Sequence, residues 1–124
     1  MKALRFIAQL PFSRRQRHAL QSRDGVTRDH FVSELAADDI EASAAGLLWD
    51  KLVQAAVISD FRPMTDDNFL HLYGLADEDL DDDLISEILI KLNLPLPSAT
   101  DLSLIGNIDT PKDFMKLVHL AIAK

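Results

Sequence analysis

The chain has 124 residues, of which 48% are apolar, with a formal net charge of −7 and no cysteine. This apolar fraction excludes a disordered chain, and the length is typical of one domain. The absence of cysteine excludes disulfides and thiolate chemistry and fits a reducing compartment. No apolar run approaches the roughly 18 residues of a membrane span, and no secretory cleavage site follows the first residues, so we expect a cytoplasmic protein without a membrane span.

Charge is divided unevenly along the sequence. Residues 1–28 hold seven basic side chains and one acidic, whereas residues 29–124 hold six basic and nineteen acidic. We interpret residues 1–35 as a basic N-terminal helical arm and residues 36–124 as an acidic bundle, together forming one compact domain. Opposite charges favour an arm that lies across its own body, and contact with a separate anionic partner is the alternative.

Proline and glycine mark breaks between segments whose apolar residues have helical spacing. Two short helices are expected first, over residues 2–10 and 14–21, on either side of Pro11. Thr27 is a suitable N-cap for a third helix, of which Phe31 marks the inner face.

An amphipathic pattern predicts a long helix over about residues 39–57, capped by Asp38 or Asp39. Trp49 falls off the apolar stripe of this helix. It is therefore either an exposed anchor for a partner or a ring covered by the N-terminal arm.

The clearest pattern predicts a helix over residues 78–92, after a loop with a short turn that Asp66 or Asp67 caps. Its inner face consists of Leu80, Leu84, Ile85, Ile88, Leu89 and Leu92. Its start is crowded with carboxylates, which the positive end of a helix dipole stabilises. These carboxylates belong to Asp77, Glu78, Asp79, Asp81, Asp82 and Asp83.

The last helix is predicted over residues 111–123. Thr110 is its N-cap, Pro111 suits the first helical position, and Asp113 completes a pattern like a capping box. No segment shows the alternation of a strand, so the predicted fold class is all-α.

Two stretches connected with these helices resemble acyl and peptidyl carrier proteins. The stretch from Leu92 to Pro97, Leu-Asn-Leu-Pro-Leu-Pro, is similar to that family's exit from its second helix. The stretch from Ile108 to Phe114, Ile-Asp-Thr-Pro-Lys-Asp-Phe, is similar to the entry to its last helix. The resemblance, over about residues 39–124, implies an acyl-carrier-like four-helix bundle, here with an additional N-terminal helical arm.

Carrier proteins attach 4′-phosphopantetheine to the serine of an Asp-Ser-Leu triplet at the start of the second helix. In this sequence the serine position falls on Glu78 or Asp79, and a carboxylate cannot form that phosphodiester. The resemblance therefore implies a carrier-like, non-enzymatic protein without a prosthetic group. Ser86 is the only serine of this helix, so a true carrier with 4′-phosphopantetheine on a displaced serine, Ser86 first, is the alternative.

Carriers use the second helix to dock onto partners, so we expect a partner protein with a basic surface at the acidic residues. The candidate partner-binding residues are Asp77, Glu78, Asp79, Asp81, Asp82, Asp83 and Trp49. A solvated helix start whose charges match the dipole is the structural interpretation of the same cluster. A calcium loop is excluded because Asp82 and Ile88 stand where that loop needs glycine and glutamate.

Other chemistries lack their residues in this sequence. The four histidines are scattered, so no metal site is expected. The arginines between Arg14 and His18 lack interleaved aromatic residues, so no nucleic-acid partner is expected. Catalytic and phosphate-binding motifs are absent, so we expect no enzyme. A small helical ligand-binding protein, with a pocket between the N-terminal arm and the bundle, is the remaining hypothesis.

Overall fold

The structure of the chain is a computed structural model that describes residues 2–76 and 79–124, with side chains described outside 2–10 and 81–83. Its described residues form helices and connecting loops, without a strand, which confirms the all-α class. The elements are α1 (Lys2–Leu20), α2 (Arg28–Leu35), α3 (Asp39–Ala55), α4 (Phe69–Tyr73), the π-helix η1 (Asp79–Ile85), α5 (Ser86–Lys91), α6 (Ala99–Ile105) and α7 (Pro111–Ile122). No helix in these ranges has both the length and the apolar character to cross a bilayer.

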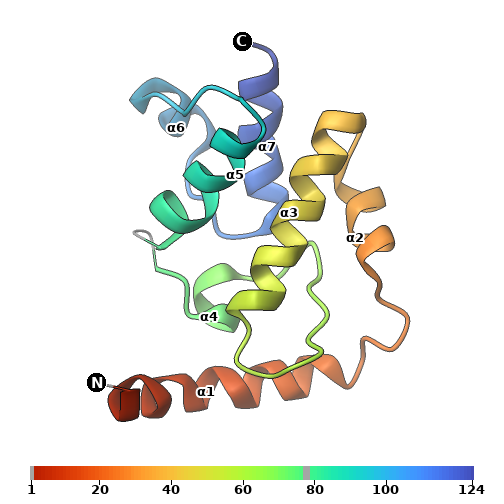
Figure 1. Ribbon diagram of the computed structural model, residues 1–124, viewed down its shortest axis with the longest axis vertical. Helices are drawn as coiled ribbons and strands as arrows, with labels where there is room; N and C mark the ends of the chain where they lie inside the picture. Colours follow the sequence, from red (N-terminus) through yellow and green to blue (C-terminus); the bar gives the residue numbers. More distant parts are fainter. Residues whose placement is uncertain (1, 77–78) are drawn as a thin grey trace.

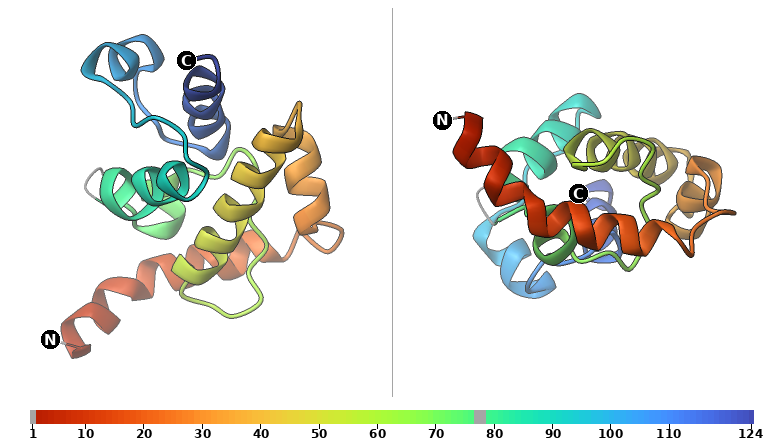
Figure 2. Two further views of the ribbon diagram at one scale, coloured as in Figure 1. Left: turned by 45° about the horizontal axis from the view of Figure 1, so that its top comes forward. Right: turned by 90° about the horizontal axis from the view of Figure 1, so that it is seen from below.

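The helices α3, α5 and α7 pack together around the core, with α2 beside α3 and α6 beside α7 (Figure 1). Helix α1 lies crosswise at the opposite end of the molecule from the C-terminus, next to α4 (Figure 1). Seen from two further directions, the second half of α1 lies against the body while its first half extends past it (Figure 2). The chain therefore begins with a helix that covers one end of the bundle.

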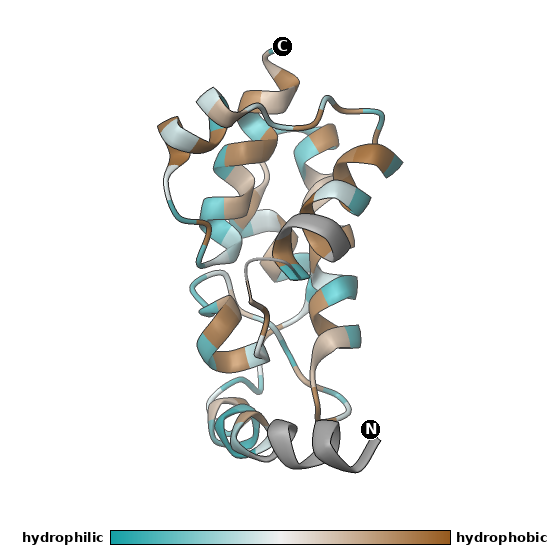
Figure 3. Ribbon diagram, turned by 90° about the vertical axis from the view of Figure 1, so that its left-hand side faces the viewer, coloured by the Kyte–Doolittle hydropathy of each residue, from teal (hydrophilic) through white to brown (hydrophobic). Residues whose placement is uncertain are grey.

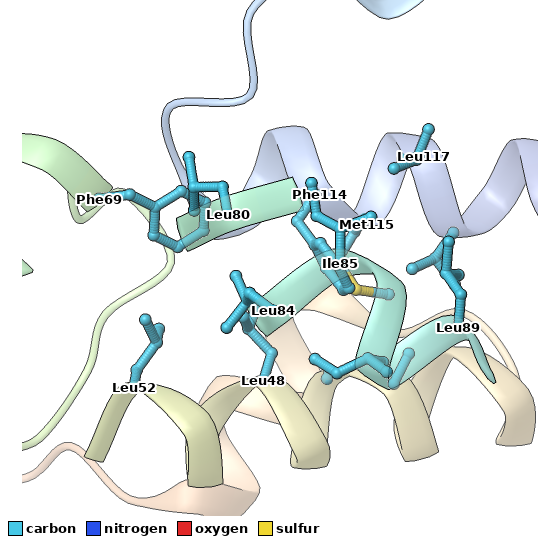
Figure 4. Close-up of a cluster of buried hydrophobic side chains, with 14 of the residues drawn as sticks. Leu48, Leu52, Phe69, Leu80, Leu84, Ile85, Leu89, Phe114, Met115 and Leu117 are labelled. Carbon is cyan, nitrogen blue, oxygen red and sulfur yellow. The ribbon is translucent and has the colours of Figure 1, made fainter. Parts of the chain in front are cut away.

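The core is built from the apolar faces that the spacing predicts. Hydrophobic and hydrophilic residues alternate in short blocks along the helices, as amphipathic helices require (Figure 3). Leucines of α3 meet side chains of η1, α5 and α7 in one cluster (Figure 4). Leu52, Leu89 and Phe114 are fully buried there. Burial of each such side chain contributes about 1.5–3 kcal/mol, which makes this cluster the main stabilising feature of the bundle.

Three predicted N-caps are confirmed. The Thr27 side chain accepts a hydrogen bond from the His30 backbone N–H at 3.2 Å. Asp38, rather than Asp39, caps α3, and its Oδ1 accepts from the next turn at 2.8 Å. At α7, Thr110 and Asp113 form a reciprocal capping box, which fixes the start of the last helix.

Two local predictions are wrong. The two short helices expected around Pro11 are one helix, because a proline removes only one backbone donor and the turns on both sides still form their own hydrogen bonds. The cap of α4 is Asn68, whose Oδ1 accepts from the His71 N–H at 2.7 Å, and neither Asp66 nor Asp67. Asp67 is instead buried, where an arginine holds its carboxylate.

The predicted helix over 78–92 begins differently from an ordinary α-helix, because its first described turns form η1 and only Ser86–Lys91 is α-helical. A π-helix pairs residues five apart, so one turn takes more residues than an α-helical turn. Leu80 therefore shares the buried side with the pair Leu84 and Ile85, four and five positions on. The wide spacing at the start of this pattern is consistent with that geometry.

Candidate functional site

The acidic segment, residues 77–83, is the first candidate site. Asp77 and Glu78 lie outside the described residues, and the side chains of 81–83 lie outside the described side chains. Asp79 is half-buried, and its Oδ2 accepts a hydrogen bond from the Ala76 backbone N–H at 3.0 Å. This carboxylate thus satisfies a backbone donor just before η1, as a helix cap does.

The buried apolar residues of η1 and α5 anchor this part of the chain. Leu80, Leu84 and Ile85 are between 2% and 5% exposed and belong to the core cluster. The backbone that carries the acidic residues is therefore held against α3 and α7 by side chains that do not reach solvent. Leu80 is the only apolar residue of the acidic segment, so any contact of this segment with another molecule has to use its charged residues.

Ser86 is the first residue of α5 and follows η1 without a break. It is half-buried, and it lies within the run of η1 and α5 rather than at the start of that run. An enzyme that modified its hydroxyl would have to reach into the middle of a packed helical element.

Trp49 does not stand free on α3. It is half-buried, and its ring meets the ring of Phe31 edge to face, with the centroids 5.3 Å apart. Phe31 belongs to α2, within the predicted arm, so the position agrees with the interpretation in which the arm covers this tryptophan. Trp49 packs against the same core cluster that contains Leu80 of the acidic segment.

A buried ionic cluster connects residues that the sequence analysis did not bring together. Both carboxylate oxygens of Asp67 accept hydrogen bonds from the Arg23 guanidinium, at 2.5 and 2.9 Å. The Tyr73 hydroxyl donates to the same carboxylate at 2.9 Å, and the Met64 backbone N–H donates at 2.8 Å. Burial, with the negative charge of Asp67, raises the pKa of Tyr73 above its ordinary value.

Around this cluster every group has a structural partner. The Arg23 guanidinium also donates to the Arg62 carbonyl at 2.8 Å and stacks over the ring of Phe61. That ring in turn meets Tyr73 edge to face. Among the described side chains no buried polar atom lacks a hydrogen-bond partner, so nothing in this cluster is left over for a substrate. We therefore assign it to stability. Its members are distant in the sequence and form no sequence motif, so the sequence did not predict the cluster.

Gln16 of α1 forms a second buried connection, to α4 and to the loop after α3. Its side chain is fully buried and donates to the Leu72 carbonyl at 2.9 Å. The side-chain oxygen accepts from the backbone N–H groups of Val57 and Ile58, at 2.9 and 3.2 Å. Nearby, Arg15 donates to the His71 carbonyl at 2.9 Å. The second half of α1 is thus held by directed hydrogen bonds as well as by charge.

A hydroxyl, a carboxylate and an imidazole lie in a row beside α2, in an order that differs from that of a catalytic triad. The Thr65 hydroxyl donates to Glu34 at 2.9 Å, and the other carboxylate oxygen of Glu34 lies 2.7 Å from His30 Nε2. In a Ser-His-Asp type of triad the histidine lies next to the hydroxyl, whereas here the glutamate separates the two. The described residues also include no group of three or more side chains that could hold a metal ion.

Concave surfaces of different size are present on the described part of the bundle. A smaller one of about 240 Å³ lies between α3 and α5, where Lys51 and Glu87 form an ion pair of 2.5 Å across it. A larger groove of about 620 Å³ runs along α7, with Leu35 of the predicted arm on one side and Ile105 of α6 on the other. The larger one lies between the predicted arm and the bundle.

Comparisons of this chain with protein-family models, with curated proteins and with solved structures find no match.

Proposed function

We propose that this protein is a non-enzymatic interaction module with an acyl-carrier-like helical bundle. It binds a partner protein with a basic surface through its acidic segment, and it carries no prosthetic group. The observation that supports this proposal is the order of the elements after the arm. A long α3 is followed by a long connection that contains the short α4, and then by η1 continuing into α5, by the short α6 and by α7. Apart from α4, this is the order of helices in carrier proteins.

The charge of the acidic segment supports the choice of partner. Six of its seven residues are carboxylates, and the seventh, Leu80, is buried in the core. So dense a negative charge on a helical element attracts basic surfaces and accelerates their association. The positive charges of this chain do not offset it nearby in sequence, since no lysine or arginine occurs between Arg62 and Lys91.

The proposed lack of a prosthetic group follows from the same residues. Phosphopantetheine transfer needs a hydroxyl oxygen that attacks a phosphate, and positions 78 and 79 offer carboxylates that repel it. The Asp79 carboxylate is in addition engaged with the Ala76 N–H. We expect the intact mass to stay unchanged after co-expression with a broad-specificity phosphopantetheinyl transferase. A gain of one phosphopantetheine arm that disappears in Ser86→Ala would replace this proposal with a carrier modified at Ser86.

Partner binding can be tested with a lysine-rich amphipathic helical peptide as the probe, followed by fluorescence anisotropy. Replacing three carboxylates of the acidic segment, with Asp81→Asn, Asp82→Asn and Asp83→Asn, removes charge while keeping side-chain shape. We expect this variant to lose about tenfold or more in affinity and to show a weaker dependence on salt.

A second triple variant provides the matched control. Asp24→Asn, Asp60→Asn and Asp109→Asn change the net charge by the same amount at exposed positions elsewhere. If both variants weaken binding equally, the peptide responds only to net charge, and the acidic segment is not a docking site. Unchanged helical circular dichroism in both variants is required for the comparison.

A further inference from the structure

The groove along α7 is not used by the proposed function. Its floor is one face of α7, where side chains follow at intervals of three and four residues. These floor residues are Lys112, Met115, Lys116, His119 and Leu120. The end of α2 and the start of α3 form one wall, and α6 forms the other. The floor, from 112 to 120, runs roughly 12 Å along the helix axis.

The α6 wall offers apolar surface to an incoming molecule. Leu104 is 73% exposed, the highest value among the large apolar side chains described. Ile105 beside it and Leu120 on the floor are half-buried, so the three continue the apolar surface from the rim into the groove. A rim of this kind, next to charged residues, is typical of a surface that another protein covers.

Glu34 also lines the groove, with a side chain that is 44% exposed, but its carboxylate accepts from the Thr65 hydroxyl at 2.9 Å and lies 2.7 Å from His30. The charges that are left without such partners are positive. Lys112 is already held by Asp66 at 2.7 Å. Glu41 on the opposite wall is buried and accepts a hydrogen bond from the Ala37 backbone N–H. Lys116, by contrast, has an exposed side chain whose described ion pair is a 3.6 Å contact with its own helix neighbour.

His119 adds a second exposed group to the floor. Its side chain is 77% exposed, and its ring nitrogen lies 3.4 Å from a Glu41 oxygen. With Lys116 one turn before it, it forms a polar strip beside Leu120 on a protein whose net charge is −7. This strip suits carboxylates on a partner. The apolar residues set the position of a bound helix, and the lysine attracts the edge of that helix that carries the carboxylates.

We propose that this groove binds an amphipathic helix of a partner protein. The apolar stripe of that helix packs against Leu104, Ile105 and Leu120, and carboxylates along one of its edges face Lys116 and His119. The groove is open, so it does not enclose a small molecule as ligand pockets do. Its length matches two turns of a helix with anchors at i, i+3 or i+4, and i+7.

The test uses a synthetic helical peptide with a leucine stripe flanked by glutamates, labelled for anisotropy and mapped by amide chemical shifts. One control peptide has the same composition with the stripe broken, and another has lysines in place of the glutamates. We expect binding of the first peptide only, with shifts confined to residues 104–120 and to the end of α2.

Variants of exposed residues locate the site without threatening the fold. Leu104→Asp and Lys116→Glu should each weaken peptide binding by about tenfold or more. The matched controls Leu70→Asp on α4 and Lys91→Glu on α5, both at exposed positions, should change it by less than about twofold. The triple variant of the acidic segment should keep the affinity of the parent protein, which separates this site from the proposed function.

Several results would overturn the proposal. Equal affinity for the lysine peptide would contradict the assigned charge, and undiminished binding to Leu104→Asp would contradict the apolar anchor. Saturable binding of decanoate in the groove, without binding of the peptide, would make it a site for a small amphiphile. Shifts in the groove that depend on protein concentration, in the absence of peptide, would identify a second copy of this chain as the occupant.

Discussion

At the scale of single residues, a few buried polar side chains make many of the hydrogen bonds that join distant parts of the chain. Asp67 receives four hydrogen bonds, from Arg23, Tyr73 and a backbone N–H. A buried carboxylate in such a setting is stable because its charge is paired and its lone pairs are filled. Loss of one partner leaves a buried charge or polar group unpaired. Substitution of any of these residues should therefore lower the free energy of unfolding strongly.

The single tyrosine reports on this cluster. Because the folded state raises the pKa of Tyr73 above its ordinary value of 10.0, the folded protein keeps the phenolic proton that the unfolded chain releases. Folding stability should therefore fall as the pH rises above about 10. We expect tyrosinate absorbance to appear only together with the loss of helical circular dichroism. In Tyr73→Phe this contribution to the pH dependence should vanish. Tyrosinate forming near pH 10 in a fully helical protein would contradict the burial of this hydroxyl.

Gly74 combines a left-handed backbone conformation with a close neighbour, and both disfavour a side chain there. Its φ is +72°, and a Cβ built there would lie 3.0 Å from the ring of Phe12 on α1. Gly74→Ala should cost about 1–2 kcal/mol of unfolding free energy for the left-handed conformation, with the clash in addition. Gly25→Ala is the control, because a Cβ at Gly25 meets nothing within 4 Å. Urea unfolding of both variants measures the difference, and equal stability would refute the contact with Phe12.

At the scale of elements, the final helix shows how an amphipathic pattern divides its residues between core and surface. Leu117 on α7 is 1% exposed and lies within the core cluster, whereas Leu104 on α6 is 73% exposed. Leu117→Ala should therefore lower the unfolding free energy by about 2–5 kcal/mol. Leu104→Ala should change it by less than about 0.5 kcal/mol. Thermal unfolding that gave the two leucines similar costs would show that the inner face of α7 is assigned incorrectly.

The caps and the core faces of most elements follow from the sequence, while the π-helix does not. The starts of three helices are predicted by their N-cap residues, Thr27, Asp38 and Thr110. A side-chain oxygen just before an apolar pattern satisfies the free backbone donors of the first turn. The apolar positions of η1 and α5 were also identified correctly. Their spacing does not distinguish an α-helix, with backbone hydrogen bonds between residues four apart, from a π-helix, with bonds between residues five apart. Both kinds of helix place these apolar residues on one side.

At the scale of the whole molecule, α1 and the bundle form one structure through the loop that joins α3 to α4. The Gln16 side chain serves as a hydrogen-bond partner for three backbone groups of residues 57, 58 and 72. Arg23 just after α1 pairs with Asp67 in the same loop region. The backbone N–H groups of Val57 and Ile58 in this loop therefore depend on α1 for their hydrogen bonds.

Gln16→Ala tests this dependence. It leaves three backbone groups without their partner, and each buried unpaired group costs about 1–3 kcal/mol unless water replaces it. We expect a loss of at least about 2 kcal/mol in unfolding free energy and faster amide exchange at Val57 and Ile58. Gln21→Ala at an exposed position just after α1 is the control and should be neutral. If high salt destabilised the parent protein more than Gln16→Ala does, charge attraction would be the main force that holds α1.

The sequence by itself determined the helical class, most of the core and the caps, because these depend on patterns within one segment. It also grouped Asp79, Asp81, Asp82 and Asp83, which all fall in η1, since they are close together in the chain. The choice between the two interpretations of Trp49 stayed open, because the answer lies in Phe31 on another helix.

Only the tertiary structure decided which polar groups meet across long distances in the chain. The ion pair of Arg23 with Asp67, the hydrogen bonds of Gln16 and the groove along α7 each join segments that are separated by dozens of residues. Such contacts depend on the relative placement of whole helices, and that placement is set by the sum of many weak packing interactions. A local pattern predicts which face of a helix is buried, but it does not predict which neighbouring element packs against that face.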